Sequence, residues 1–242
     1  LIAQTLIPAL LHADQPFQVC IDGGTHNPMS PPFEFLAGSY LPLLRRMGAH
    51  VEAQLVRRGF YPAGGGRIEL SIGTCTGLAP IELCSRGALL RKQAVATVSR
   101  LPLSIAHREL ATLGDALGWP AEILHAREDD DGTGPGNAVI VELEFENLTE
   151  VFSGFGLKGR PAETVAEGVA TTVADYLAGA AAVDAHLADQ LLLPMAIAGG
   201  GRFTTLQPTQ HTLTNIGIIE AFLPVGIRVE RNREEFSTIT VG

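Results

Sequence analysis

Apolar and polar positions along the chain predict the same order of elements near both ends. Each end shows a helix, a strand, a loop that contains a histidine, a second helix and two strands. In the first copy the elements are predicted at 2–12, 17–21, 33–47, 50–57 and 67–72. In the second copy they are predicted at 183–198, 202–206, 212–223, 226–230 and 236–241. Such repetition predicts two units of one architecture, each with two helices on one face of a small mixed sheet. We expect the units to pack through their helices.

The middle of the chain follows a different pattern, which predicts a separate α+β unit inserted between the two copies. Strands are predicted at 80–86, 91–99, 121–126, 138–146 and 150–156, and helices at 102–117 and 161–178. The clearest alternation lies in 138–146, where Val139, Val141, Leu143 and Phe145 are predicted to face inward. We therefore predict an α+β fold with a discontinuous main domain, residues 1–79 and 181–242, and an inserted smaller domain, residues 80–180.

Composition narrows the function classes. The chain is 46% hydrophobic, which allows a sizeable core, and its net charge of -9 argues against wrapping nucleic acid over a broad basic face. Local arginines could still recognise one nucleic-acid end. The three cysteines lack the paired spacing of a metal site, which fits a reducing cytoplasm. No run approaches the ~18 apolar residues of a membrane span, so we expect no membrane partner and a cytoplasmic location.

The polar stretch 208–215 carries the most suggestive chemistry. His211 lies among threonines of the kind found at helix starts, directly before an apolar run that predicts a short helix. A helix N-terminus attracts anions, and a neutral imidazole there could attack phosphorus and hold a phosphoryl group as a phosphoramidate. The alternative is a histidine whose hydrogen bonds are satisfied at a helix boundary. Taken alone, the stretch favours that alternative.

Other stretches allow two interpretations each. The aromatic and glycine-rich segment 60–66 could approach a ligand and stack on a base, or form a hairpin turn. Segment 186–190 could bind a ribose or a base edge, or its polar side chains could pair locally. The loop 22–30 is better explained as a structural turn than as an ion site. The acidic run 128–131 lacks the ligand spacing of a calcium loop.

Five motifs, taken together and in order, resemble those of the RNA 3'-terminal phosphate cyclase family. They are Gly23–Pro28 with Pro31 and Pro32, Phe60–Gly66, Gly134–Asn137, Leu187–Leu191 and His211–Asn215. The resemblance implies repeated split β-α-β units, with two helices on a four-stranded sheet, plus an inserted domain. It implies that ATP and Mg²⁺ or Mn²⁺ are used to convert an RNA 3'-phosphate end into a 2',3'-cyclic phosphate. In this scheme a histidine takes up AMP, passes it to the RNA phosphate, and the 2'-hydroxyl then expels it.

The resemblance also implies roles for particular residues. His211 becomes the nucleophile that carries AMP. The implied nucleotide contacts are Gln4, His186, Leu187, Ala188, Asp189 and Gln190, with Phe60 and Pro62 as further walls of an adenine pocket. The family often has a tyrosine at the position of His186. The resemblance assigns no metal ligand within this sequence.

Two alternatives stay open beside the cyclase interpretation. Family members begin with a further repeat unit that carries a Glu-Gly-Gly-Gly-Gln loop, whereas Leu1 here resembles the middle of the family's sequence, so we expect that unit to be absent. The chain could then be an inactive truncated cyclase. It could also be a noncatalytic relative that acts in ribosome assembly, although those relatives lack the histidine found here at position 211.

Overall fold

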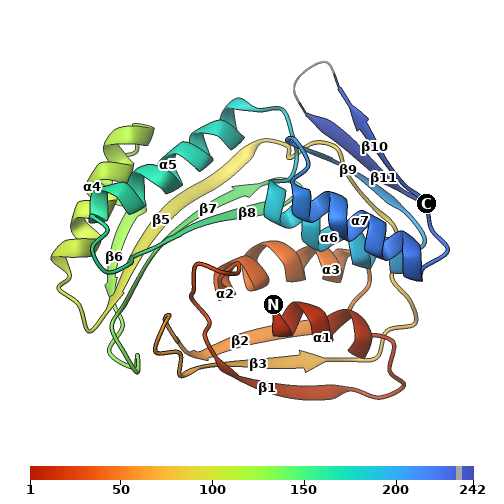
Figure 1. Ribbon diagram of the computed structural model, residues 1–242, viewed down its shortest axis with the longest axis horizontal. Coiled ribbons are helices and arrows are strands. Elements are labelled where there is room, and N and C mark those ends of the chain that lie inside the picture. Colours follow the sequence, from red (N-terminus) through yellow and green to blue (C-terminus); the bar gives the residue numbers. More distant parts are fainter. Residues whose placement is uncertain (233–235) are drawn as a thin grey trace.

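The computed structural model describes residues 1–232 and 236–242 and shows three sheets covered by helices (Figure 1). The first unit contains α1 (Ile2–Leu10), β1 (Phe17–Gly23), α2 (Phe33–Phe35), a π-helical turn (Leu36–Tyr40), α3 (Leu41–Arg46), β2 (Val51–Arg57) and β3 (Gly66–Ile72). The last unit contains α6 (Ala185–Ile197), β9 (Gly201–Thr205), α7 (Gln210–Phe222), β10 (Ile227–Arg231) and β11 (Ser237–Val241). The predicted α+β class is confirmed.

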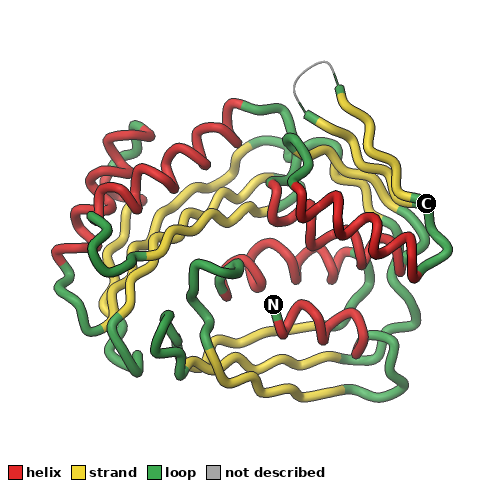
Figure 2. The backbone as a smooth tube through the Cα atoms, viewed as in Figure 1, coloured by secondary structure: helices red, strands yellow, loops and turns green. Residues whose placement is uncertain are grey.

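Strand order confirms the internal repeat. The first sheet has the order β1-β3-β2, and the corresponding strands of the last unit follow the order β9-β11-β10. In both units the last strand therefore lies in the centre, antiparallel to its two neighbours. The helices of the two units lie between their sheets, and α6 contacts both α1 and the π-helical turn (Figure 2). The expected packing of the units through their helices is confirmed.

One strand belongs to a different sheet from the one we expected. We expected residues 80–86 in the inserted unit, but β4 (Ile81–Leu83) pairs in parallel with β9. It gives the last unit a four-stranded sheet, whereas the sheet of the first unit has three strands. Ile81 and Leu83 are buried and Glu82 is exposed, a pattern that fits the edge of either sheet. Alternation predicts a strand but does not identify its partner.

The inserted unit forms a sheet with two helices on one face. Its elements are β5 (Leu89–Ser99), α4 (Ser104–Leu117), a 3-10 turn (Ala121–Ile123), β6 (Leu124–Glu128), β7 (Gly136–Phe145), β8 (Thr149–Phe155) and α5 (Ala162–Ala178). The sheet order is β6-β5-β7-β8. The strand predicted at 121–126 begins later, because the chain first makes a turn after Pro120. Helix α4 ends, as predicted, at Gly118, whose φ of 61° is the left-handed conformation that glycine adopts readily.

Strand β7 is buried on both faces, which shows how the inserted unit is attached. Val139, Val141 and Leu143 pack into the core under α4 and α5, as the alternation predicts. Ala138 and Ile140 on the opposite face join the core of the two repeated units. The sheet of the inserted unit thus lies between its own helices and the rest of the molecule. This placement brings β8 and α5 next to the helices of the last unit (Figure 1).

Glu109 makes the stability of the inserted unit depend on pH. This α4 residue is fully buried, and Asn137 Nδ2 donates a hydrogen bond of 2.7 Å to its Oε2 atom. Burial raises the pKa of Glu109 from 4.5 to about 7. Its protonated form therefore stabilises the fold fully below pH 4.5, and this contribution is lost as the pH rises through about 7.

We predict that Glu109→Gln flattens this dependence. The free energy of unfolding, measured with urea at several values between pH 5 and 8, should fall less with rising pH in the variant than in the wild type. Gln keeps an oxygen that can accept from Asn137, so the two proteins should differ least at the acidic end. Parallel curves for the two proteins would contradict the assigned pKa.

Candidate functional site

Helix α7 begins with a side-chain cap that fixes the position of His211. Thr209 Oγ1 accepts a hydrogen bond of 3.2 Å from the backbone N–H of Thr212, as the threonine-rich sequence predicts. The Oγ1 atoms of Thr209 and Thr212 lie 3.0 Å apart, and Thr212 is fully buried. His211 therefore lies in the first turn of a capped helix, with an exposed side chain.

Helix α6 begins with a second cap, made by Asp184. Its Oδ1 atom accepts from the backbone N–H of Leu187 at 2.9 Å, and its Oδ2 atom lies 3.3 Å from Nδ1 of His186. Asp184 is buried, whereas the ring of His186 is exposed. The hydrogen bond to Asp184 raises the pKa of His186 above its ordinary value, against the opposing effect of partial burial. The first turn of α6 therefore presents an imidazole that protonates readily.

A direct contact between side chain and main chain holds the two helix starts together. Asn215 Nδ2 of α7 donates to the backbone oxygen of Asp189 at 3.1 Å and to its Oδ1 atom at 3.2 Å. Gln190 Nε2 donates to Asp189 Oδ2 at 3.1 Å. Asp189 and Gln190 thus do pair locally, which was one of the two interpretations of this segment. The pairing fixes the spacing between the helices that carry His186 and His211.

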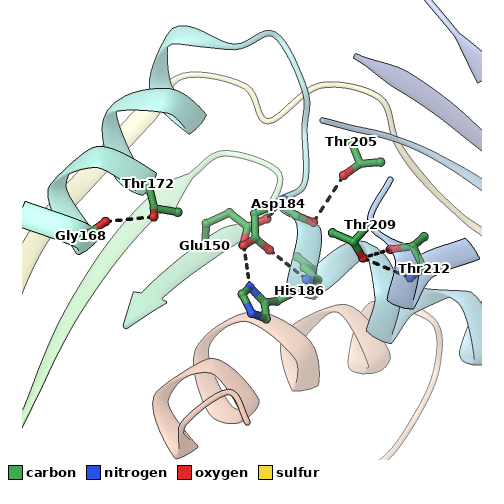
Figure 3. A network of polar contacts seen from close by, with 9 residues as sticks. Glu150, Gly168, Thr172, Asp184, His186, Thr205, Thr209 and Thr212 are labelled. Atoms are coloured by element: carbon green, nitrogen blue, oxygen red, sulfur yellow. Dashed lines mark hydrogen bonds and ion pairs between the residues drawn. The ribbon is translucent and has the colours of Figure 1, made fainter. Parts of the chain in front are cut away.

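These helix starts line a pocket of about 550 Å³, within the usual range of about 300–1,000 Å³ for small-molecule sites. One wall carries His186, Asp189, Gln190, Thr209 and His211. A second wall comes from the inserted unit, from β8 and from the face of α5 that contains Gly168 and Thr172. Figure 3 shows this face opposite the first turns of α6 and α7. The loop before α2 closes the third side.

The pocket brings together four of the predicted site residues: His186, Asp189, Gln190 and His211. Leu187 and Ala188 belong to the same segment, but both are fully buried in the core, so their side chains do not face the pocket. Gln4 is also buried and does not line the pocket. Within the described part of the chain, its Nε2 atom has no hydrogen-bond partner.

Phe60 and Pro62 do not line this pocket. Phe60 is 3% exposed and packs against His26, with 5.2 Å between the ring centroids, and Pro62 lies exposed on the surface. Gly136 explains the close packing, because a Cβ atom there would lie 2.0 Å from the Phe60 ring. Thr133 Oγ1 also donates to the backbone oxygen of Gly64 at 2.8 Å. The glycine-rich motifs 60–66 and 134–137 therefore join the first unit to the inserted unit.

The sequence interpretation missed part of the pocket. Pro28, Pro31 and Pro32 line it, and so do Arg160 and the wall formed by β8 and α5. The paired prolines were visible as part of a motif and could have been proposed as a rigid wall. The contribution of the inserted unit had no local signal, because it depends on how distant segments pack.

The structure offers no evident metal centre in the residues that it describes. They contain no group of three or more His, Cys, Asp or Glu side chains placed to hold an ion. In the acidic run, Glu128 ends β6, and Asp129 Oδ1 lies 3.8 Å from Nη1 of Arg58. Across residues 1–232 and 236–242, no helix has the length and apolarity needed to cross a membrane.

Fold and site together define a class: an α+β protein of repeated units, with a histidine-bearing pocket between helix starts and an inserted domain. A model of the RNA 3'-terminal phosphate cyclase family matches residues 1–229. Proteins of that name from Pseudomonas fluorescens, Ectopseudomonas mendocina and Koribacter versatilis are 52%, 49% and 46% identical over 97%, 94% and 95% of this chain. The chain belongs to the RNA 3'-terminal phosphate cyclase family. It spans 68%, 66% and 64% of these three relatives.

We predict that Thr209→Ala destabilises the protein by about 1 kcal/mol, because the first turn of α7 loses its cap. Thr209→Ser keeps the hydroxyl and should recover most of the loss. Chemical denaturation of the three proteins measures both effects. Equal stability of the alanine variant and the wild type would show that the cap contributes nothing to the stability of the first turn of α7.

Proposed function

We propose that the chain carries the active site of an ATP-dependent enzyme that converts an RNA 3'-terminal phosphate into a 2',3'-cyclic phosphate. The observation that supports this best is the position of His211. It lies exposed at a capped helix start, in a pocket of nucleotide size that it shares with His186 and Asp189. Membership of the cyclase family supplies the reaction class.

In the proposed reaction, a ring nitrogen of His211 attacks the α-phosphorus of ATP. An N–P bond forms, the bond to the bridging oxygen of the β-phosphate breaks, and pyrophosphate leaves. An oxygen of the RNA 3'-phosphate then attacks the same phosphorus, which breaks the N–P bond and frees the histidine. Finally the 2'-hydroxyl loses its proton and attacks the RNA phosphorus, so that AMP leaves and the cyclic phosphate closes.

The described residues suggest how the pocket would support these steps. The free N–H groups at the start of α7 favour the negative charge of the phosphates. In this proposal His186, Asp189 and Gln190, which line the pocket, contact the nucleoside, whereas Leu187 and Ala188 contribute only through their backbone. Gln4 stays a proposed nucleotide contact that would need ligand-induced exposure. Phe60 and Pro62 are not part of this proposal, since neither lines the pocket.

Mg²⁺ or Mn²⁺ would neutralise charge on the triphosphate in this proposal. The described side chains include no cluster that fits such an ion, so no residue is assigned to hold it. The RNA 3'-phosphate end is the proposed second substrate. A cytoplasmic location remains a prediction from composition.

Covalent labelling tests the proposal. We predict that the protein incubated with α-labelled ATP and a divalent metal acquires acid-labile label that survives a denaturing gel. His211→Ala should abolish the label, because the attacking nitrogen is removed. His107→Ala is the matched control, since His107 is an exposed histidine on α4, outside the pocket.

Two outcomes would contradict the proposal. Label retained in His211→Ala would place the nucleophile elsewhere. A folded wild-type protein that acquires no label would instead favour the inactive-fragment alternative. Copurification with preribosomal particles, without labelling, would favour the ribosome-assembly alternative.

A further inference from the structure

Glu150 is a fully buried carboxyl group directly behind the pocket. It belongs to β8 of the inserted unit, and its Oε1 atom accepts from the backbone N–H of Asp184 at 2.8 Å. Its Oε2 atom has no hydrogen-bond partner within the described part of the chain. Burial, followed by the nearby charge of Asp184, raises the pKa of Glu150 well above its ordinary value. A buried carboxylate is costly to ionise, so burial and the negative charge of Asp184 both favour the uncharged form of Glu150.

Asp184 connects this buried acid to the pocket. Its backbone N–H donates to Glu150, while its carboxylate caps α6 and contacts Nδ1 of His186. Thr205 of β9 approaches the backbone oxygen of Asp184 at 3.5 Å. Figure 3 shows Glu150, Asp184 and His186 in contact one after the other, from the inserted unit to the pocket.

We propose that Glu150, Asp184 and His186 form a positioning relay for the nucleotide site. Glu150 fixes the backbone of Asp184 without adding a second negative charge beside it. The carboxylate of Asp184 holds the imidazole of His186 through Nδ1. His186 then meets the phosphates or the base of the nucleotide as a protonated, oriented ring. This inference rests on the proposed function and adds a pH dependence to nucleotide affinity.

The charges around His186 set the direction of this dependence. Asp184 and Asp189 favour the protonated ring. Arg160 of the inserted unit and His211 of α7 line the same pocket, and a positive charge on either one opposes protonation of His186. The net effect is a raised pKa for His186, with the hydrogen bond to Asp184 as the largest cause. ATP is a polyanion, so its affinity should be highest below this pKa and should fall as the pH rises through it.

A simpler account gives the same residues a purely structural role. Asp184 would cap α6, Glu150 would satisfy one backbone N–H, and the contact with His186 would have no effect on the pocket. The two accounts differ for Asp184→Asn. An asparagine can still accept from the N–H of Leu187, so the cap survives in both accounts. Only the relay predicts that the pH dependence of ATP affinity also changes.

The first experiment compares the wild type with Asp184→Asn. NMR titration of the His186 ring, without nucleotide, should give a lower pKa in the variant, with little change in thermal stability. Calorimetry with ATP across pH 6–9 should show that the affinity of Asp184→Asn for ATP falls at a lower pH than the affinity of the wild type. Near neutral pH the dissociation constant should rise by about fivefold, as expected for the loss of one partly exposed charge contact. An unchanged pH profile of ATP affinity would overturn the relay, even if the pKa of His186 falls.

Two variants of Glu150 test whether its carboxyl group is uncharged. Glu150→Gln replaces one uncharged acceptor by another, so the His186 pKa should stay at its wild-type value. Glu150→Ala leaves the N–H of Asp184 unpaired and should weaken ATP binding. If the alanine variant fails to fold, the His186 pKa measured in the glutamine variant still tests whether Glu150 is uncharged. A lower His186 pKa in Glu150→Gln would show that Glu150 carries a charge, and this would overturn its assigned part.

A double variant separates the relay from the proposed function. In a His186→Ala background, Asp184→Asn should cause no further change in ATP affinity. A wild-type protein that binds no ATP contradicts the proposed function, and with it the effect of the relay on affinity. A wild type that binds ATP, with Asp184→Asn acting equally with and without His186, contradicts the relay alone.

Discussion

The burial of helix α6 is the constraint on which the rest of the molecule depends. Leu187, Leu191, Leu192 and Met195 are fully buried, and the helix packs against α1, the π-helical turn, α7 and the strands β9 and β11. A helix enclosed on so many sides has little surface left for a ligand except at its ends. Its first turn is the part that reaches the pocket, with His186 exposed and Asp189 and Gln190 partly exposed. The same apolar residues that hold the two units together therefore determine where polar chemistry can occur.

The repeated topology explains why a second helix start meets this first turn. In the last unit, α6 and α7 lie on the same side of their sheet, and Asn215 fixes one to the other at Asp189. The first unit has the same order of elements, but the loop before its second helix contains a buried histidine. His26 is 2% exposed. Thr25 Oγ1 lies 2.7 Å from its Nδ1 atom, and Glu34 Oε2 lies 2.9 Å from its Nε2 atom. The first unit thus encloses its imidazole in the loop before the second helix, whereas the last unit presents an accessible imidazole in the first turn of that helix.

The sequence predicted most of this arrangement where the determining forces are local. Helical spacing, strand alternation and glycine stops gave the elements and the repeat, and Thr209 gave the cap beside His211. It failed where the outcome depends on distant partners. Nothing local shows that β4 pairs with β9 or that Phe60 packs under Gly136. The buried side chain of Leu187 was equally hidden, because a binding segment and a core segment can share the same residues on alternate faces.

The inserted unit completes the pocket because polar contacts attach it to both repeated units. On one side, Arg58 of the first unit lies 3.4 Å from Glu34 Oε1 and 3.8 Å from Asp129 Oδ1 in the loop after β6. Burial opposes ionisation of Glu34, but the hydrogen bond and charge of His26, a backbone hydrogen bond and the charge of Arg58 together outweigh it and hold the pKa of Glu34 at about 2. On the other side, toward the last unit, the contact runs through Glu150, whose pKa is raised rather than lowered. The difference follows from partners, since Glu34 has a histidine and an arginine within reach, whereas Glu150 has a backbone N–H and a neighbouring negative charge. The inserted unit is therefore attached on one side beside a carboxyl group whose ionisation is favoured, and on the other side through a carboxyl group whose ionisation is opposed.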